Sequence, residues 1–82
     1  MFDLDKIVYS TKPITLRERI LAQQGANGDW QAMHAYICCR TNLTPDEAYE
    51  LDDEDTSAVI DGIGKGLVQG LQLQNMLRST HD

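Results

Sequence analysis

Cysteine, proline and aromatic residues are scarce in this chain of 82 residues. Its two cysteines, Cys38 and Cys39, are adjacent, and neighbouring side chains on a helix point in different directions, so a disulfide between them would be strained. We therefore expect reduced thiols. No apolar run approaches the ~20 residues that cross a bilayer, and no charged-then-apolar leader stands at the start. These absences predict a cytoplasmic protein that does not act on membranes.

Basic residues are absent from residues 41 to 64, which contain eight acids. Seven of the ten positions from Asp46 to Asp55 are acidic, and the whole chain has a net charge of −6. Direct binding of nucleic acid needs a basic patch that displaces counterions from phosphates, so this distribution argues against it. An acidic run at a helix start is commonly solvated and interacts favourably with the helix dipole. It also permits a basic protein partner.

Recognisable patterns of catalytic or metal-binding residues are lacking as well. His34 and Cys38 are one helical turn apart, but no second histidine or amide is placed by the sequence to orient the imidazole. Zinc needs about four ligands in a recognisable spacing, and the acidic run lacks the glycine and the final acid of a calcium loop. We expect no enzymatic activity, no catalytic residue, no metal and no cofactor.

Helix-start signals are what the sequence does contain. Thr15 and Glu18 have the spacing of a capping box, in which each side chain bonds the backbone of the other residue. Thr44 and Glu47 repeat that spacing, and Asp29 is placed to cap a helix between the two boxes. Each signal precedes apolar residues at helical spacing. The sequence therefore predicts three successive helix starts.

The sequence signals are weaker for the helix ends and for the start of the last helix. Gly25 is a plausible stop for the first helix, Asn42 is expected to end the second in a left-handed conformation, and Leu51 closes the short third helix. The last and longest helix begins at an acidic cap, which is one of three residues: Asp52, Asp53 or Asp55. Its expected apolar positions are Val59, Ile60, Ile63, Leu67, Leu71 and the pair Met76-Leu77.

Residues 1–82 are predicted to form a single all-α domain, a small bundle of about four helices. The chain is 41% hydrophobic, which is too apolar for a disordered acidic chain. Ile7-Val8-Tyr9 is β-prone and is followed by Pro13, which indicates a short N-terminal strand or an extended arm. We expect the arm to span residues 1–13, the helical core residues 14–78 and a tail residues 79–82.

Glycine recurs every four residues in the last predicted helix. Gly62, Gly66 and Gly70 then form a strip without side chains, which we call the glycine strip, and Gly64 lies elsewhere on the circumference. Four glycines destabilise a helix by roughly 4 kcal/mol relative to alanine, so a compensating contact is expected. Three outcomes stay open: packing inside the domain, contact with a partner or a second copy of the chain, or a bent or fraying helix.

Aromatic and apolar residues of the second predicted helix are candidates for partner binding. Trp30, the only tryptophan, is expected to anchor the core. Alternatively, Trp30, Met33 and Tyr36 form an exposed groove for an apolar partner helix. The full candidate set has an apolar part, Trp30, Met33, Tyr36, Ile37, Ile63, Leu67 and Leu71, and an acidic part, Glu50, Asp52, Asp53 and Asp55.

Short motifs between residues 10 and 68 resemble a known family. They are Lys12-Pro13-Ile14-Thr15, Gly28-Asp29 and Leu43-Thr44-Pro45-Asp46-Glu47, with Leu51, Asp55, Val59 and Ile60 after them. This pattern is similar to that of phage tail assembly chaperones, in which a short capped helix leads through an acidic turn into a final helix. Two features depart from the family's pattern: residues 15 to 24 predict a helix where the family often has an extended segment, and the last predicted helix is rich in glycine.

The resemblance implies a function without catalysis. A tail assembly chaperone binds the long, apolar, helix-rich tape measure protein in the cytoplasm of the infected cell, keeps it soluble and helps tail tube subunits assemble around it. An apolar groove would shield the partner helices, and acidic surface would keep the complex soluble. The alternative from another class is an acidic regulatory protein that binds a basic surface of a host protein.

Overall fold

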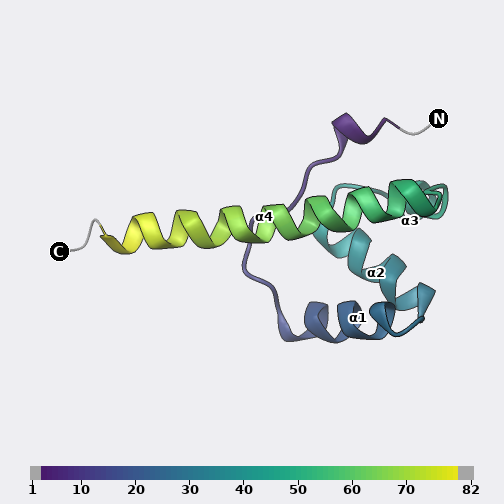
Figure 1. Cartoon of the computed structure of the whole chain (residues 1–82), viewed down its shortest axis with the longest axis horizontal. Helices are drawn as coiled ribbons and strands as arrows, with labels where there is room; N and C mark the ends of the chain where they lie inside the picture. The colour runs from purple at the N-terminus through teal and green to yellow at the C-terminus, as the bar shows by residue number, and fades with distance from the viewer. Residues whose placement is uncertain (1–2, 80–82) are drawn as a thin grey trace.

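The computed structural model describes residues 3 to 79, and this part of the chain is all-α (Figure 1). It contains a short 3-10 helix followed by four α-helices: η1 (Leu4–Lys6), α1 (Leu16–Ala26), α2 (Trp30–Arg40), α3 (Pro45–Tyr49) and α4 (Asp53–Ser79). Between η1 and α1 runs an extended segment, residues 7–14, which we call the arm. Residues 3 to 79 contain no β-strand, and the arm makes only an isolated antiparallel bridge between Tyr9 and Thr41. The predicted fold class is confirmed.

The predicted limits of the arm and of the tail each differ from the observed element bounds. The predicted arm of residues 1–13 includes η1, which the sequence did not indicate, and residues 1 and 2 lie outside the described part. The last helix continues to Ser79, and the rest of the predicted tail, residues 80–82, also lies outside the described part.

Both capping boxes form as the sequence predicts. The Thr15 hydroxyl accepts a hydrogen bond from the Glu18 backbone N–H at 3.2 Å, and the Glu18 carboxylate accepts one from the Thr15 N–H at 3.0 Å. Thr44 and Glu47 make the same pair of bonds at 3.2 and 3.0 Å. Asp29 caps α2 by accepting from the Ala32 N–H at 3.1 Å. These local bonds satisfy backbone donors that a helix start leaves unpaired.

Asp52 is the N-cap of α4, which begins at Asp53. The Asp52 carboxylate accepts a hydrogen bond from the Asp55 N–H at 2.8 Å, which decides among the three acidic candidates. At the end of α1, Gly25 is not the stop, because the helix continues to Ala26. Gly25 instead permits a close approach of α2: a Cβ atom added there would lie 2.9 Å from the Cβ of Met33.

The prediction that Asn42 ends α2 in a left-handed conformation is wrong. The helix stops at Arg40, Thr41 is extended, and within residues 3 to 79 only glycine has a positive φ. The Thr41 hydroxyl donates to the Ile37 carbonyl at 2.7 Å, so the helix end is satisfied without a left-handed residue. Asn42 binds the arm instead, because its side chain accepts from the Val8 N–H at 2.9 Å and its own N–H donates to the Val8 carbonyl.

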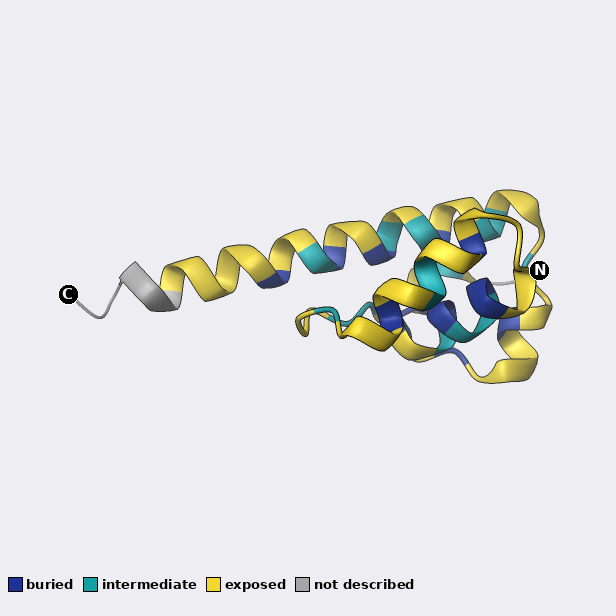
Figure 2. Cartoon of the chain, turned by 90° about the horizontal axis from the view of Figure 1, so that it is seen from below, coloured by how far each residue is buried: buried dark blue, intermediate teal, exposed yellow. Residues whose placement is uncertain are grey.

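The core lies where α2 contacts the other helices. α2 packs against α1 on one side and against α3 and α4 on the other. Val59 and Ile63 of α4 are 0% and 1% exposed. Around them lie the other buried residues of the core: Ile7, Met33, Tyr36, Ile37, Leu43 and Ala48. Figure 2 shows the buried residues gathered in this body, while the C-terminal part of α4 extends away from it and is mostly exposed.

The glycine strip packs inside the domain, against the arm. Gly62 lies under the Tyr9 ring, and Gly70 lies so close to the Thr11 carbonyl that no side chain fits between them. A Cβ atom added at Gly66 would lie 2.9 Å from the Ser10 carbonyl oxygen. Of the three open outcomes, the structure therefore selects intramolecular packing, with an extended segment rather than a helix as the neighbour.

A buried ion pair fixes the course of the arm. The guanidinium of Arg40 donates to the Glu18 carboxylate at 3.2 Å and to the carbonyls of Ser10 and Lys12 at 3.1 and 2.7 Å. Burial alone raises the pKa of Glu18, but hydrogen bonds from Thr15 and Arg40 and the Arg40 charge outweigh burial and lower that pKa below its ordinary value. Arg40 thus joins α1, α2 and the arm at one point.

Candidate partner-binding surfaces

Four members of the predicted partner-binding set belong to the core. These are Met33, Tyr36, Ile37 and Ile63, all of them buried. The idea that Met33 and Tyr36 form an exposed face with Trp30 is therefore wrong. α1, α3 and α4 all pack on α2, so the inner face of this helix is covered within the domain.

Trp30 is not a core residue. Its side chain is 69% exposed, contrary to the prediction that the indole anchors the core. Trp30 is the first residue of α2, and side chains on a helix lean toward its N-terminus. The indole therefore extends past the end of the helix instead of lying over the inner face. Sequence spacing placed Trp30 on the same face of α2 as Met33 and Ile37. It could not show that the buried part of this face begins only at about Met33, after the first turn.

An aromatic groove lies between the start of α2 and α3. It has a volume of about 210 Å³ and is lined by Trp30, Gln31, Met33, His34, Ile37, Ala48, Tyr49, Leu51 and Thr56. Tyr49 is 67% exposed, and its ring stacks on that of His34 with 3.9 Å between centroids and 14° between planes. Tyr49 was not among the predicted site residues, because only the tertiary structure brings α3 beside the start of α2.

The groove also holds the histidine that was weighed as a catalytic residue. His34 Nε2 lies 2.9 Å from the Pro45 carbonyl oxygen. A carbonyl oxygen only accepts, so the proton sits on Nε2 and this nitrogen is not free to take a proton from Cys38, whose Sγ lies 3.9 Å away. Burial raises the pKa of the Cys38 thiol, and Cys39 raises it further. This arrangement opposes formation of a reactive thiolate.

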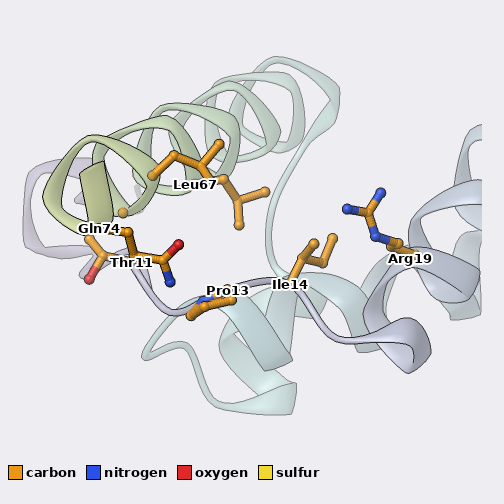
Figure 3. Close-up of a pocket in the computed structure, with 8 residues that line it drawn as sticks. Thr11, Pro13, Ile14, Arg19, Leu67 and Gln74 are labelled. Atoms are coloured by element: carbon orange, nitrogen blue, oxygen red, sulfur yellow. The ribbon is translucent and has the colours of Figure 1, made fainter. Parts of the chain in front are cut away.

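A second hollow, which we call the arm cleft, opens between the arm and α4 (Figure 3). Its volume is about 320 Å³, and its lining residues are Thr11, Pro13, Ile14, Arg19, Leu67, Gly70, Leu71 and Gln74. Leu67 lies across the cleft from Pro13 and Ile14, and Arg19 of α1 reaches in from one end. Sequence analysis identified Leu67 and Leu71, but it missed Pro13 and Ile14 because the course of the arm depends on the buried Arg40.

The arm cleft continues onto an uncharged stretch of α4. Residues 66 to 77 contain no acidic or basic residue. Leu71 is 60% exposed, and Val68, which does not line the cleft, is 56% exposed. Leu73 and Met76 are exposed farther along the helix. The side chain of Leu77, a predicted apolar position, lies outside the described residues. The C-terminal part of α4 is thus an uncharged helix, with exposed apolar residues among glutamine and asparagine, that extends from an acidic body.

The acidic candidates lie near the N-terminal end of α4, and most of them stabilise the start of this helix. Asp52 caps the helix, and Asp53 and Asp55 stand in its first turn, where a negative charge interacts favourably with the helix dipole. Glu50 is the C-cap of α3 and follows Tyr49 at the edge of the aromatic groove. In the part of the chain that the structure describes, histidine, cysteine and acidic residues form no group of three that could hold a metal ion.

The apolar part of the predicted set therefore separates into four core residues, Trp30 at the aromatic groove, and Leu67 and Leu71 at the arm cleft. The acidic part lies at the end of α3 and the start of α4. Within residues 3 to 79, none of the helices combines the length and apolar character that crossing a membrane requires. No protein-family model, curated protein or solved structure matches this chain, so its resemblance to phage tail assembly chaperones stays a prediction.

Proposed function

We propose that this protein is a non-enzymatic phage tail assembly chaperone that binds an apolar helical segment of the tape measure protein and keeps it soluble. The observation that carries the proposal is the arm cleft, an apolar hollow continuous with the exposed, uncharged end of α4. Concave apolar surface beside an exposed helix face suits an amphipathic partner helix. The family resemblance supplies the identity of that partner.

The charge distribution of the chain supports such a role. The neutral stretch from residue 66 to residue 77 carries no carboxylate that binding would strip of water. The acids gather in residues 46 to 55, toward the other end of α4, where they keep a net negative surface after the apolar end is covered. Such a surface opposes self-association of the complex and keeps it soluble. In this proposal the C-terminal end of α4 binds the partner, and the acidic residues near its N-terminal end keep the complex soluble.

The test is a pulldown of the tagged full chain from cells that express its native genomic neighbours, with bound proteins identified by mass spectrometry. We expect a long, helix-rich, apolar protein that stays bound in a high-salt wash and becomes insoluble without this chain. Leu71→Gln should weaken its retention, because it places a polar group in the cleft. Val68→Gln changes a similarly exposed residue of α4 that does not line the cleft, and we expect this variant to bind as the wild type does.

Two results would overturn the proposal. Recovery of only a basic host protein that high salt releases, with no apolar partner retained in the high-salt wash, would instead favour the acidic regulatory protein. Equal retention of the apolar partner by the wild type and the Leu71→Gln variant would remove the arm cleft from the binding site.

A further inference from the structure

We infer that the aromatic groove is a second docking surface, which binds a protein segment carrying an apolar anchor residue flanked by arginine or lysine. The inference goes beyond the proposed function and does not depend on what occupies the arm cleft. It rests on three features: two exposed aromatic residues that line the groove, an apolar floor between them, and exposed carboxylates next in sequence to two of the lining residues, which we call the acidic rim.

The aromatic wall is ordered before anything binds. The Tyr49 ring is largely exposed, yet it is fixed by its stack on His34, and His34 is itself held by the Pro45 carbonyl. Trp30 provides the facing wall from the start of α2. A rigid exposed aromatic residue gives contact area without the loss of side-chain freedom that normally weakens binding.

The floor selects an apolar anchor. Met33, Ile37 and Ala48 line the groove and also belong to the core, so their positions are set by the packing of the domain. A volume of about 210 Å³ admits individual side chains rather than a whole helix. An aliphatic side chain of the partner would displace water from this floor, which is the favourable step in hydrophobic association.

The rim selects positive charge beside that anchor. In the sequence, Glu50 lies between Tyr49 and Leu51, and Asp52 and Asp53 follow Leu51; all three acids are exposed. The whole segment from residue 41 to residue 64 is without a basic residue. A guanidinium or ammonium group bound here gains the field of these carboxylates and the negative faces of the two aromatic rings. A neutral segment would gain neither effect, and an acidic segment would be repelled.

The only tryptophan lies in the groove, so its fluorescence reports binding there directly. The full chain is titrated with a synthetic amphipathic helical peptide of leucine and lysine, and separately with the same peptide in which glutamate replaces every lysine. We expect a saturable change of Trp30 emission with the lysine peptide, weakening as salt is added, and none with the glutamate peptide.

Three variants locate the site. Tyr49→Ala should weaken binding of the lysine peptide roughly tenfold, because it removes one wall. Glu50→Gln should weaken it roughly threefold and reduce its salt dependence, since one rim carboxylate is lost. Asp61→Asn is the control: it removes a carboxylate of α4 that lies more than one turn beyond Thr56, the residue of α4 that lines the groove, and that pairs with Lys65, and we expect unchanged affinity. Circular dichroism of each variant checks that the helices persist.

The inference fails if the glutamate peptide binds as well as the lysine peptide, or if Glu50→Gln and Asp61→Asn weaken binding equally. It also fails if Leu71→Gln abolishes binding while Tyr49→Ala does not, because the peptide would then occupy the arm cleft. None of these results bears on whether a tape measure protein binds that cleft, so the two proposals stand or fall separately.

Discussion

The two halves of α4 form one continuous helix, but they differ in how far their side chains are buried. Up to Gly70 the helix packs on α2 and the arm, with Val59 and Ile63 fully buried. After Gly70, Leu71 and Leu73 are exposed although they are as hydrophobic as the buried residues. The difference teaches that the arm, rather than the helix's own apolar pattern, sets where the domain ends.

The same comparison explains why glycine is concentrated in the first half. Glycine lowers helix stability by about 1 kcal/mol per residue, and the contacts of the strip with the arm offset that loss. Beyond Gly70 the helix contains no glycine, and it is continued from a turn that is already formed. Extending an existing helix is far easier than starting one.

The largest effect is expected from breaking the anchor of the arm. Arg40→Met should lower the free energy of unfolding by about 3 to 5 kcal/mol, because it leaves the Glu18 carboxylate buried without its partner. Urea denaturation followed by circular dichroism measures the change. Lys65→Met is the control, since it removes an exposed ion pair with Asp61 and should change stability by less than about 1 kcal/mol. Similar losses in both variants would contradict the role assigned to Arg40.

Two alanine substitutions compare the side of α4 that the arm covers with a side that it leaves exposed. Gly64→Ala should raise the free energy of unfolding by about 1 kcal/mol, because the added Cβ would have no described atom within 4 Å apart from its chain neighbours and the helix's own nearby backbone. Gly70→Ala should lower it by about 2 kcal/mol, because the Cβ meets the Thr11 carbonyl and the backbone has to move. Thermal unfolding of both variants provides the check. An increase in both would show that the strip is not tightly packed in solution.

The smallest effect is expected in the second half of α4. Leu73→Gln changes an exposed side chain to one with good helix propensity, so the free energy of unfolding should stay within about 0.5 kcal/mol of the wild type. The same denaturation experiment measures it. A loss of more than about 1 kcal/mol would mean that this part of the helix packs against protein surface in solution, and the two halves would then be less different than they are in the structure.

Only part of the candidate site could be predicted from sequence. Leu67 and Leu71 were identified because their helical spacing is a local property. Tyr49 and Ile14 were missed, because each enters a surface only through the way distant segments pack. Trp30 was assigned to the core from its residue type and its place on a helix face, whereas its exposure follows from its position at the very end of α2.

The sequence by itself determined where the helices begin. Four cap side chains each bond a backbone N–H three residues away, so these starts need nothing from the rest of the chain: Thr15, Asp29, Thr44 and Asp52. Only the tertiary structure decided which surfaces are buried. Residue 40 meets residue 18 and the arm from far along the chain, and the arm then covers the glycine strip. Such contacts depend on the packing of whole elements, which no local pattern of residues specifies.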